Sequence, residues 1–259
     1  MKQKIFIFFV LIFVLDIHGF DIKKKTLLDF TSPANAKYRD GENVIGFNDV
    51  FLTGKPLVFF LIYYKCPTVC NTQLNSFFKA VKELNLTPGK EFHLTVLSFD
   101  HHETPELALK KKNAYMEEFE KSGKKADFRF LTGDKESIQQ ITDSLRFTFY
   151  FDKNEKQWVH PVGAYIYTSE GRFFRKIGGT IFQPETLYYT LAEIDPSIMN
   201  SFSKKVHLYF LRYDMMAGDY KLHTDRIEHV LIPLFLLFSG AFIFFKLYKT
   251  LKRKKNYTG

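Results

Sequence analysis

The sequence predicts an α/β fold that is joined to a C-terminal transmembrane helix. From residue 57 onward, short apolar runs alternate with segments in which apolar residues recur every three or four positions, as in buried strands and amphipathic helices. A stretch without any charge, residues 230–245, lies near the C-terminus and is followed by a basic tail. The chain has 259 residues, so about 200 residues remain between its two ends, enough for one domain with a single core.

The first strand is expected at residues 57–64, because the run LVFFLIYY is apolar at every position and suits a strand that is covered on both faces. A helix follows, with apolar residues at helical spacing, and the sequence TPG at residues 87–89 ends it. Residues 92–99 form the next expected strand. The segment 104–121 reads as a helix that begins with Thr104 as its cap and a proline in its first turn.

The same alternation continues to residue 194. A short strand is expected at 128–131 and a helix at 134–145. Two further apolar runs, 162–168 and 172–177, flank the turn residues Ser-Glu-Gly and predict a hairpin, and a helix at 183–194 closes the unit. Strands that alternate with helices, followed by a hairpin and a last helix, together predict an α/β sandwich of thioredoxin type.

The N-terminal segment, residues 1–20, has the charge order of a secretory signal. Two lysines precede the apolar run 5–15, which is too short to span a bilayer. A cut after Gly19 is poorly supported, because Ile17 occupies a position where a small residue is preferred. Both a cleaved signal peptide and an uncleaved N-terminal anchor therefore stay open.

The C-terminal apolar stretch predicts a transmembrane helix at residues 228–248, and a buried core helix is the alternative. Six positive residues accumulate from Lys246 onward, so residues 249–259 form a basic tail that should stay in the cytoplasm. We expect a thioredoxin-like domain at 21–200 and a juxtamembrane segment at 201–227. This places the protein in the cytoplasmic (inner) membrane, with its main domain facing the periplasm or cell exterior.

The positive charge of the chain does not predict a nucleic-acid surface. The formal net charge is +9, but six positive residues belong to the C-terminal tail, and residues 23–245 keep only +3. A strongly basic face, which nucleic-acid binding requires, is therefore not expected.

The chain has only two cysteines, Cys66 and Cys70, in the stretch YYKCPTVCNTQL. Cys66 is expected at the carboxyl end of the first strand, where open α/β sheets place ligand sites, and Cys70 in the first turn of the next helix, which Pro67 suits. The free backbone amides of that turn stabilise a thiolate. A disulfide, a redox pair and a pair of metal ligands are all compatible with this position.

The spacing of the two thiols favours a metal. Residues four apart share a helical face, with roughly 5 to 6 Å between Cβ atoms, so both sulfurs can reach one soft cation. A thioredoxin-type redox motif has two intervening residues, whereas this chain has three. A disulfide would close a short loop and stabilise the fold at the small end of roughly 2–4 kcal/mol. Structural zinc usually takes four protein ligands, and His160 is the one further good candidate, so copper fits better than zinc.

Four stretches of the sequence together resemble the Sco/SenC family over residues 30–195. Members are membrane-tethered thioredoxin-fold proteins that handle copper for assembly of the dinuclear copper centre in cytochrome c oxidase. The segment YFLRYDMMAGDYKL is also similar to the tail of a bacterial branch of the family that ends in a transmembrane segment. The stretches that carry the resemblance are YYKCPTVC, SFDHHETPELALKKKNAY, FRFLTGDKESI and WVHPVGAYIYTSEGRFFRKIGG.

The resemblance implies that Cys66, Cys70 and His160 are the copper ligands. It places Asp100 at an acidic position near the metal. This chain has His101 and then His102 where relatives usually have a proline, and the pair either adds a ligand, alters the loop or simply faces solvent.

Other residues allow weaker interpretations. Trp158 is expected to pack against the site or to shield it. A second copper site near the membrane competes with plain interfacial packing for five residues, namely His207, Met215, Met216, His223 and His229.

The leading hypothesis is a copper metallochaperone, rather than an enzyme, that holds Cu(I) or Cu(II) and delivers it to an oxidase subunit, or reduces the thiols of that subunit. The alternative is a membrane-anchored thiol-disulfide oxidoreductase or a peroxidase-like enzyme, in which Lys65 lowers the pKa of Cys66. A third possibility is a structural assembly factor in which the two thiols are incidental.

Overall fold

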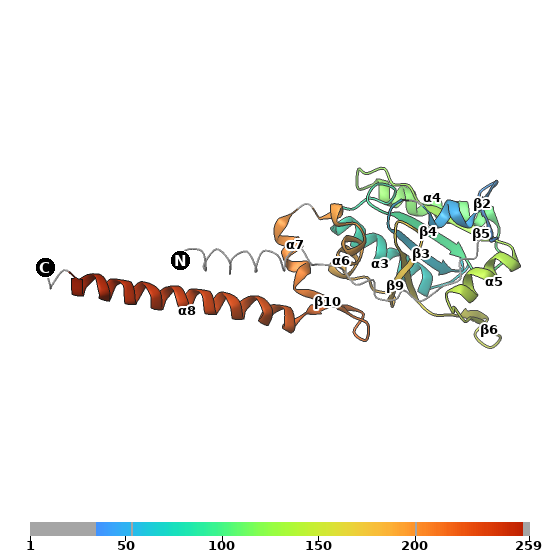
Figure 1. The fold of residues 1–259 in the computed structure, drawn as a ribbon. Helices are drawn as coiled ribbons and strands as arrows, with labels where there is room; N and C mark the ends of the chain where they lie inside the picture. The colour runs from blue at the N-terminus through green and yellow to red at the C-terminus, as the bar shows by residue number, and fades with distance from the viewer. Residues whose placement is uncertain (1–34, 53, 200, 256–259) are drawn as a thin grey trace.

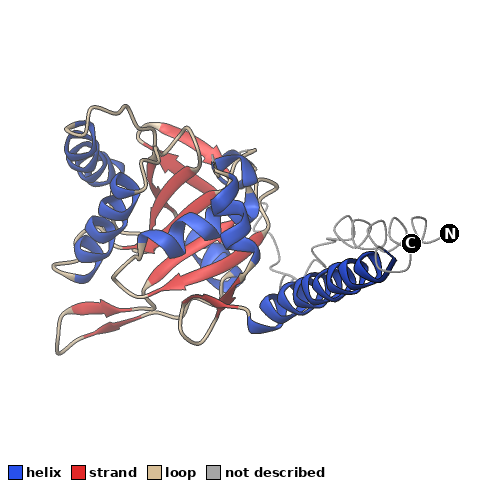
Figure 2. Ribbon diagram, turned by 90° about the vertical axis from the view of Figure 1, so that its left-hand side faces the viewer, coloured by secondary structure: helices blue, strands red, loops and turns tan. Residues whose placement is uncertain are grey.

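The computed structural model describes residues 35–52, 54–199 and 201–255, with the side chains of 251–255 left out. A sheet with helices on both sides forms the folded unit, and one long helix projects away from it (Figures 1 and 2). The predicted signal peptide or anchor at residues 1–20 lies outside the described part of the chain.

The main sheet has seven strands in the order β2-β1-β5-β4-β3-β8-β9. Its centre is parallel: β3 (Leu57–Ile62) pairs with β4 (His93–Ser98), and β4 pairs with β5 (Arg129–Gly133). On the other side of β3, the hairpin of β8 (Gly163–Tyr167) and β9 (Phe173–Gly178) adds two antiparallel strands. The predicted α/β arrangement and the hairpin are confirmed.

Strand β3 is apolar throughout because both faces of the sheet are covered at this position. All six of its residues are buried. The ring of Phe60 contacts Phe77 on one face, whereas the ring of Phe59 contacts Phe51 on the other. Successive side chains of a strand point to opposite faces, so a strand in this position has no place for a polar residue.

The four predicted helices are present: α3 (Val69–Glu83), α4 (Pro105–Glu120), α5 (Lys135–Ser144) and α6 (Pro184–Ile194). Helix α4 begins at its expected cap, since the hydroxyl of Thr104 accepts a hydrogen bond from Leu107. The carboxylate of Asp134 caps α5 in the same way by accepting a hydrogen bond from Ser137. One expectation is wrong: Pro67 precedes α3 instead of lying in its first turn, and Thr68 is the N-cap.

Several short elements are not evident from the sequence. The strands β1 (Lys37–Asp40) and β2 (Asn43–Gly46) extend the sheet beyond β5, and α2 (Phe47–Phe51) covers one face. Between α5 and β8, the strands β6 (Tyr150–Asp152) and β7 (Gln157–Val159) form a separate hairpin. Such elements are too short to show a period and depend on the sheet or on one another for their hydrogen bonds.

The segment ahead of the long helix is also folded. It comprises the short 3-10 helix η1 (Pro196–Ile198), helix α7 (Phe202–Tyr209) and a hairpin of β10 (Leu211–Asp214) and β11 (Asp219–Leu222).

The juxtamembrane hairpin is packed onto the domain around Arg175 of β9. The guanidinium group pairs with Glu193 of α6, lies 4.3 Å from the ring centroid of Tyr213 and donates a hydrogen bond to the hydroxyl of Tyr220. The chain that leads to the long helix is therefore attached to the domain by an ion pair and by stacking.

The long helix α8 (Thr224–Lys255) is separate from the core. Its segment Thr224–Thr250 is long enough and apolar enough to cross a membrane, and none of this segment is buried within the protein. The helix thus agrees in length and composition with the predicted span.

Candidate metal centre

The two thiols lie where β3 ends and α3 begins. After the strand, the chain turns, with the amide of Cys66 bonded to the carbonyl of Tyr63 at 3.2 Å, and Cys70 is the second residue of α3. The backbone amide of Cys70 donates to the sulfur of Cys66 at 3.4 Å. Both cysteines are free thiols and are buried, with 6% and 2% of their surface exposed. The predicted placement of the pair is therefore confirmed.

His160 approaches the thiols from a distant part of the chain. It follows β7, and its Nε2 atom lies 3.8 Å from the sulfur of Cys70. Its Nδ1 atom lies 3.0 Å from the carbonyl oxygen of Pro161. Because a carbonyl oxygen only accepts hydrogen bonds, Nδ1 carries the ring proton, and Nε2 turns its lone pair toward the sulfur.

Aromatic rings hold the imidazole in this position. The ring centroids of Phe99, Tyr63 and Phe147 lie 4.9, 5.9 and 5.9 Å from that of His160. Burial among these rings lowers the pKa of His160 and so favours the neutral form. A neutral imidazole with a fixed tautomer is the form that binds a metal.

The two sulfurs have different acidities. The thiol of Cys70 and then the backbone amides of Cys70 and Thr68 donate hydrogen bonds to Cys66, which lowers the pKa of Cys66 to about 5. The hydrogen bond to Cys66 and burial raise the pKa of Cys70 above its usual value. At neutral pH, Cys66 is therefore the thiolate and Cys70 the proton donor of the pair.

Tyr63 adds a further donor to this arrangement. Burial raises the pKa of its hydroxyl, which is bonded to the sulfur of Cys66. The group therefore stays protonated and stabilises the negative charge on Cys66. Sequence reasoning did not single out Tyr63, because it belongs to a run that reads as a buried strand.

Glu103 is a second residue that sequence reasoning missed. Its side chain is buried, with 4% of its surface exposed. Its carboxylate accepts hydrogen bonds from the backbone amides of Tyr64 at 2.6 Å and Lys65 at 2.7 Å, and from the hydroxyl of Ser98 at 2.6 Å. These amides directly precede Cys66, so Glu103 fixes the loop that carries the first thiol. An acidic residue just ahead of a helix cap gives no sequence signal for such a role.

The cation that acts on the thiol pair is Lys111, not Lys65 as the alternative hypothesis expected. Lys65 is exposed and faces away from the core, whereas the charge of Lys111 in α4 lowers the pKa of Cys70. The ammonium group of Lys111 is held by the side chain of Asn71 at 2.9 Å. Helix packing between α3 and α4, which the sequence does not specify, brings this charge to the site.

The loop after β4 borders the site. Asp100 accepts a hydrogen bond from the indole of Trp158 at 3.3 Å and bonds the ring of His102 at 3.0 Å. The rings of Trp158 and Phe99 are in contact, and Phe99 in turn contacts His160. His101 and His102 are exposed, as expected for loop residues. Trp158 thus packs against the wall of the site, as predicted.

The residues considered for a second site near the membrane have separate environments. His207 bonds the hydroxyl of Tyr189 at 2.8 Å, and His229 bonds the carbonyl of Asp225 within α8. Met215 and Met216 are exposed at a hairpin turn. In the described part of the chain, none of the three histidines belongs to a close group of three or more His, Cys, Asp and Glu side chains.

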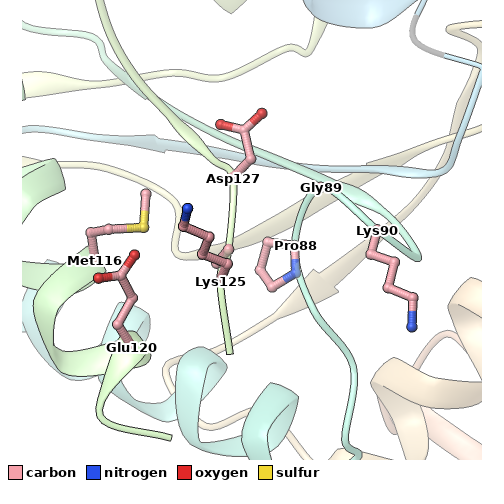
Figure 3. Close-up of a pocket in the computed structure, with 8 residues that line it drawn as sticks. Pro88, Gly89, Lys90, Met116, Glu120, Lys125 and Asp127 are labelled. Carbon is pink, nitrogen blue, oxygen red and sulfur yellow. The ribbon is translucent and has the colours of Figure 1, made fainter. Parts of the chain in front are cut away.

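A surface cavity of about 340 Å³ lies elsewhere (Figure 3). Its lining comes from the loop before β4, from the later turns of α4 and from the segment before β5, and therefore from the amino ends of the parallel strands. The thiols lie at their carboxyl ends. The cavity has no cysteine or histidine in its lining and is not the metal centre; the lining residues are Pro88, Gly89, Lys90, Met116, Glu120, Lys125, Ala126 and Asp127.

Comparison with known proteins agrees with the fold. The model of a family described as SCO1/SenC matches residues 41–194. A search of curated proteins finds no match.

Among solved structures, a protein of Aquifex aeolicus VF5 assigned to electron transfer is 22% identical, with a TM-score of 0.55, over 64% of this chain and 92% of that one. A second A. aeolicus protein, assigned to electron transport, is 21% identical with a TM-score of 0.50, over 64% and 96% of the two chains. The copper-bound structure of Arabidopsis thaliana ScoI is 19% identical, with a TM-score of 0.48, over 68% of this chain and 97% of that one. At these identities, the structural likeness shows the fold alone. The family model, however, covers more than half of the chain, including both thiols and His160, and the protein therefore belongs to the SCO1/SenC family.

Proposed function

We propose that this protein is a copper metallochaperone in which Cys66, Cys70 and His160 bind one copper ion. The observation that carries the proposal is the distance of 3.8 Å between Nε2 of His160 and the sulfur of Cys70. Metal bonds of roughly 2.0–2.3 Å that diverge by 120° place two ligand atoms about 3.7 Å apart. The observed distance therefore suits Cys70 and His160 as two ligands of a trigonal ion, and Cys66, which accepts a hydrogen bond from the thiol of Cys70, would move onto the ion as the third ligand.

The donor set favours copper as the cargo. Two thiolates and a neutral imidazole are soft and borderline ligands that suit Cu(I), and trigonal coordination needs no fourth protein ligand. One thiolate is preformed, since the pKa of Cys66 is about 5. Copper binding has to displace only the proton of Cys70, which raises affinity at neutral pH.

Delivery to the dinuclear copper centre of cytochrome c oxidase is the proposed role, as the family resemblance implies. With α8 in the cytoplasmic membrane and its basic end in the cytoplasm, the domain faces the periplasm or cell exterior. The hairpin that contains β6, next to His160, lies at the end of the folded unit away from α8 (Figure 1). This position keeps the end of the sheet that carries the buried thiols away from the lipid, on the side where an oxidase subunit would approach.

The binding step is tested on the full chain in detergent, reduced and loaded with Cu(I) without air. Wild type should bind one copper per chain, and His160→Ala should bind it at least tenfold more weakly, as expected on loss of one of three ligands. His93→Ala is the matched control, because His93 is also half-buried but begins β4 at the other end of the sheet. Equal affinity in wild type and His160→Ala would refute the proposed site.

A second function is favoured by the unequal acidity of the two thiols. A thiolate on Cys66 and a protonated thiol on Cys70 are the attacking and resolving groups that a disulfide reductase needs. Cys66 would attack a partner's disulfide, and Cys70 would then release the second partner thiol while the pair closes to a disulfide. The His160→Ala variant separates the two functions, since a dithiol reductase should retain most of its rate without the imidazole.

A further inference from the structure

We propose that Asp100, His101 and His102 form a second metal site that takes a divalent transition-metal ion, with Cu(II) preferred. The potential ligand atoms of the three side chains lie within 4.8 Å of one another. The inference concerns donors that are separate from the thiols and does not depend on the proposed copper-binding role of Cys66 and Cys70.

The loop already presents the three side chains together. The amide of Glu103 bonds the carbonyl of Asp100 at 3.0 Å, which closes a turn with the two histidines at its centre. The carboxylate of Asp100 also accepts a hydrogen bond from the amide of His102 at 3.1 Å. The centroids of the two imidazole rings are only 3.9 Å apart, so both rings lie on one side of the turn. Binding would require side-chain rotations that bring all three donors onto one ion.

The imidazole and carboxylate donors of this loop favour a different ion from the one that the two thiols favour. Imidazole and carboxylate suit divalent copper, nickel and zinc, and among these the affinity of a given site is highest for Cu(II). Cu(I) prefers the softer thiolates. The side chain of His102 is 73% exposed, so a hydrated ion can reach the loop, and water can complete its coordination.

The Asp100 loop and the site of the two thiols and His160 are separated by the side chains of Trp158 and Phe99. The indole of Trp158 donates to Asp100 at 3.3 Å, and the ring of Phe99, the residue before Asp100, contacts both Trp158 and His160. An ion on the loop is thus held next to the thiol pair without contact with the sulfurs. A Cu(II) ion on the loop would then lie outside the proposed Cu(I) site, at the same end of the sheet.

The test uses the full chain in detergent with both thiols replaced, Cys66→Ser and Cys70→Ser, titrated with copper(II) sulfate and followed by electron paramagnetic resonance. We expect one Cu(II) per chain with nitrogen hyperfine structure. Adding His101→Ala, or His101→Ala with His102→Ala, should weaken binding at least tenfold. Adding His160→Ala, or His223→Ala with His229→Ala, should leave binding unchanged.

Two outcomes would overturn the proposal: an unchanged Cu(II) signal without His101 and His102, or a signal lost with His160→Ala. A separate measurement keeps this result distinct from the thiol site. With both cysteines present, His101→Ala with His102→Ala should still bind one Cu(I) without air, which also shows that the variant is folded.

Discussion

The carboxylate of Glu103 accepts a hydrogen bond of 2.6 Å from the backbone amide of Tyr64, two residues before Cys66. A buried carboxylate from the loop after β4 thereby fixes the backbone of the loop after β3. The ring of Phe99, a few residues before Glu103, holds His160. The loop after β4 thus positions both the thiol loop and the imidazole, although none of its residues is among the three proposed copper ligands.

Glu103→Gln should loosen the thiol loop. The substitution replaces one acceptor oxygen by an NH₂ group that faces N–H donors, and we expect a loss of about 1–3 kcal/mol in the free energy of unfolding. Because the loop orients a ligand, Cu(I) affinity should fall roughly tenfold. Chemical denaturation and copper competition measure the two effects. Glu106→Gln, an exposed neighbour in the first turn of α4, should change neither, and an equal effect of both variants would contradict the positioning role.

The reactivity of Cys66 should rise with pH around a midpoint of about 5, the lowered pKa of its thiol. The thiolate is the nucleophile, so the rate of alkylation by iodoacetamide should increase through this range and be flat at pH 7. Cys70→Ala removes the first donor to Cys66 and should move the midpoint upward, and Tyr63→Phe should move it in the same direction. A wild-type midpoint near the ordinary thiol pKa would contradict the hydrogen-bonded thiolate.

Arg175→Ala should detach the juxtamembrane hairpin from the domain. The variant leaves Glu193 partly buried without its partner, and because loss of one member of a fully buried pair costs about 3–5 kcal/mol, we expect a smaller loss for this partly exposed pair. We expect faster hydrogen exchange across β10 and β11. Arg172→Ala is the matched control, because that side chain forms an exposed pair with Glu170 and should have little effect. Unchanged exchange in Arg175→Ala would show that the hairpin is held by other contacts.

Gln73→Met should stabilise the domain. Gln73 is buried in α3, with 1% of its surface exposed, and both polar atoms of its amide are without a hydrogen-bond partner. Replacing the amide by an apolar side chain of similar size should raise the free energy of unfolding by about 1–2 kcal/mol. Gln139→Met on the exposed side of α5 should bring no gain. A lower free energy of unfolding in Gln73→Met would contradict the claim that the amide of Gln73 lacks a hydrogen-bond partner.

The long elements of the fold were predictable because their sequence carries a period or a cap. The run of apolar residues in β3 and the cap at Thr104 specify their elements without help from the rest of the chain. The hairpin of β6 and β7 was not predictable, since strands of three residues show no alternation. The juxtamembrane hairpin was missed for a different reason: its packing depends on Arg175, a residue in another strand.

The candidate metal centre was predictable as far as its residue types. Cys66 and Cys70 are marked by their spacing, and His160 by the family resemblance. The sequence does not show that Nδ1 of His160 is held by the carbonyl of Pro161, nor that Glu103 is buried beneath the thiol loop. Both contacts depend on the tertiary fold, and the sequence around these residues carries no motif that predicts them.

The central claim is that one imidazole and two thiols share a copper ion, and X-ray absorption spectroscopy of the Cu(I)-loaded full chain tests it most directly. We predict two sulfur ligands and one nitrogen ligand in wild type and in His93→Ala, and loss of the nitrogen in His160→Ala. A first coordination shell of sulfur alone in wild type, or a nitrogen ligand that persists in His160→Ala, would contradict the account.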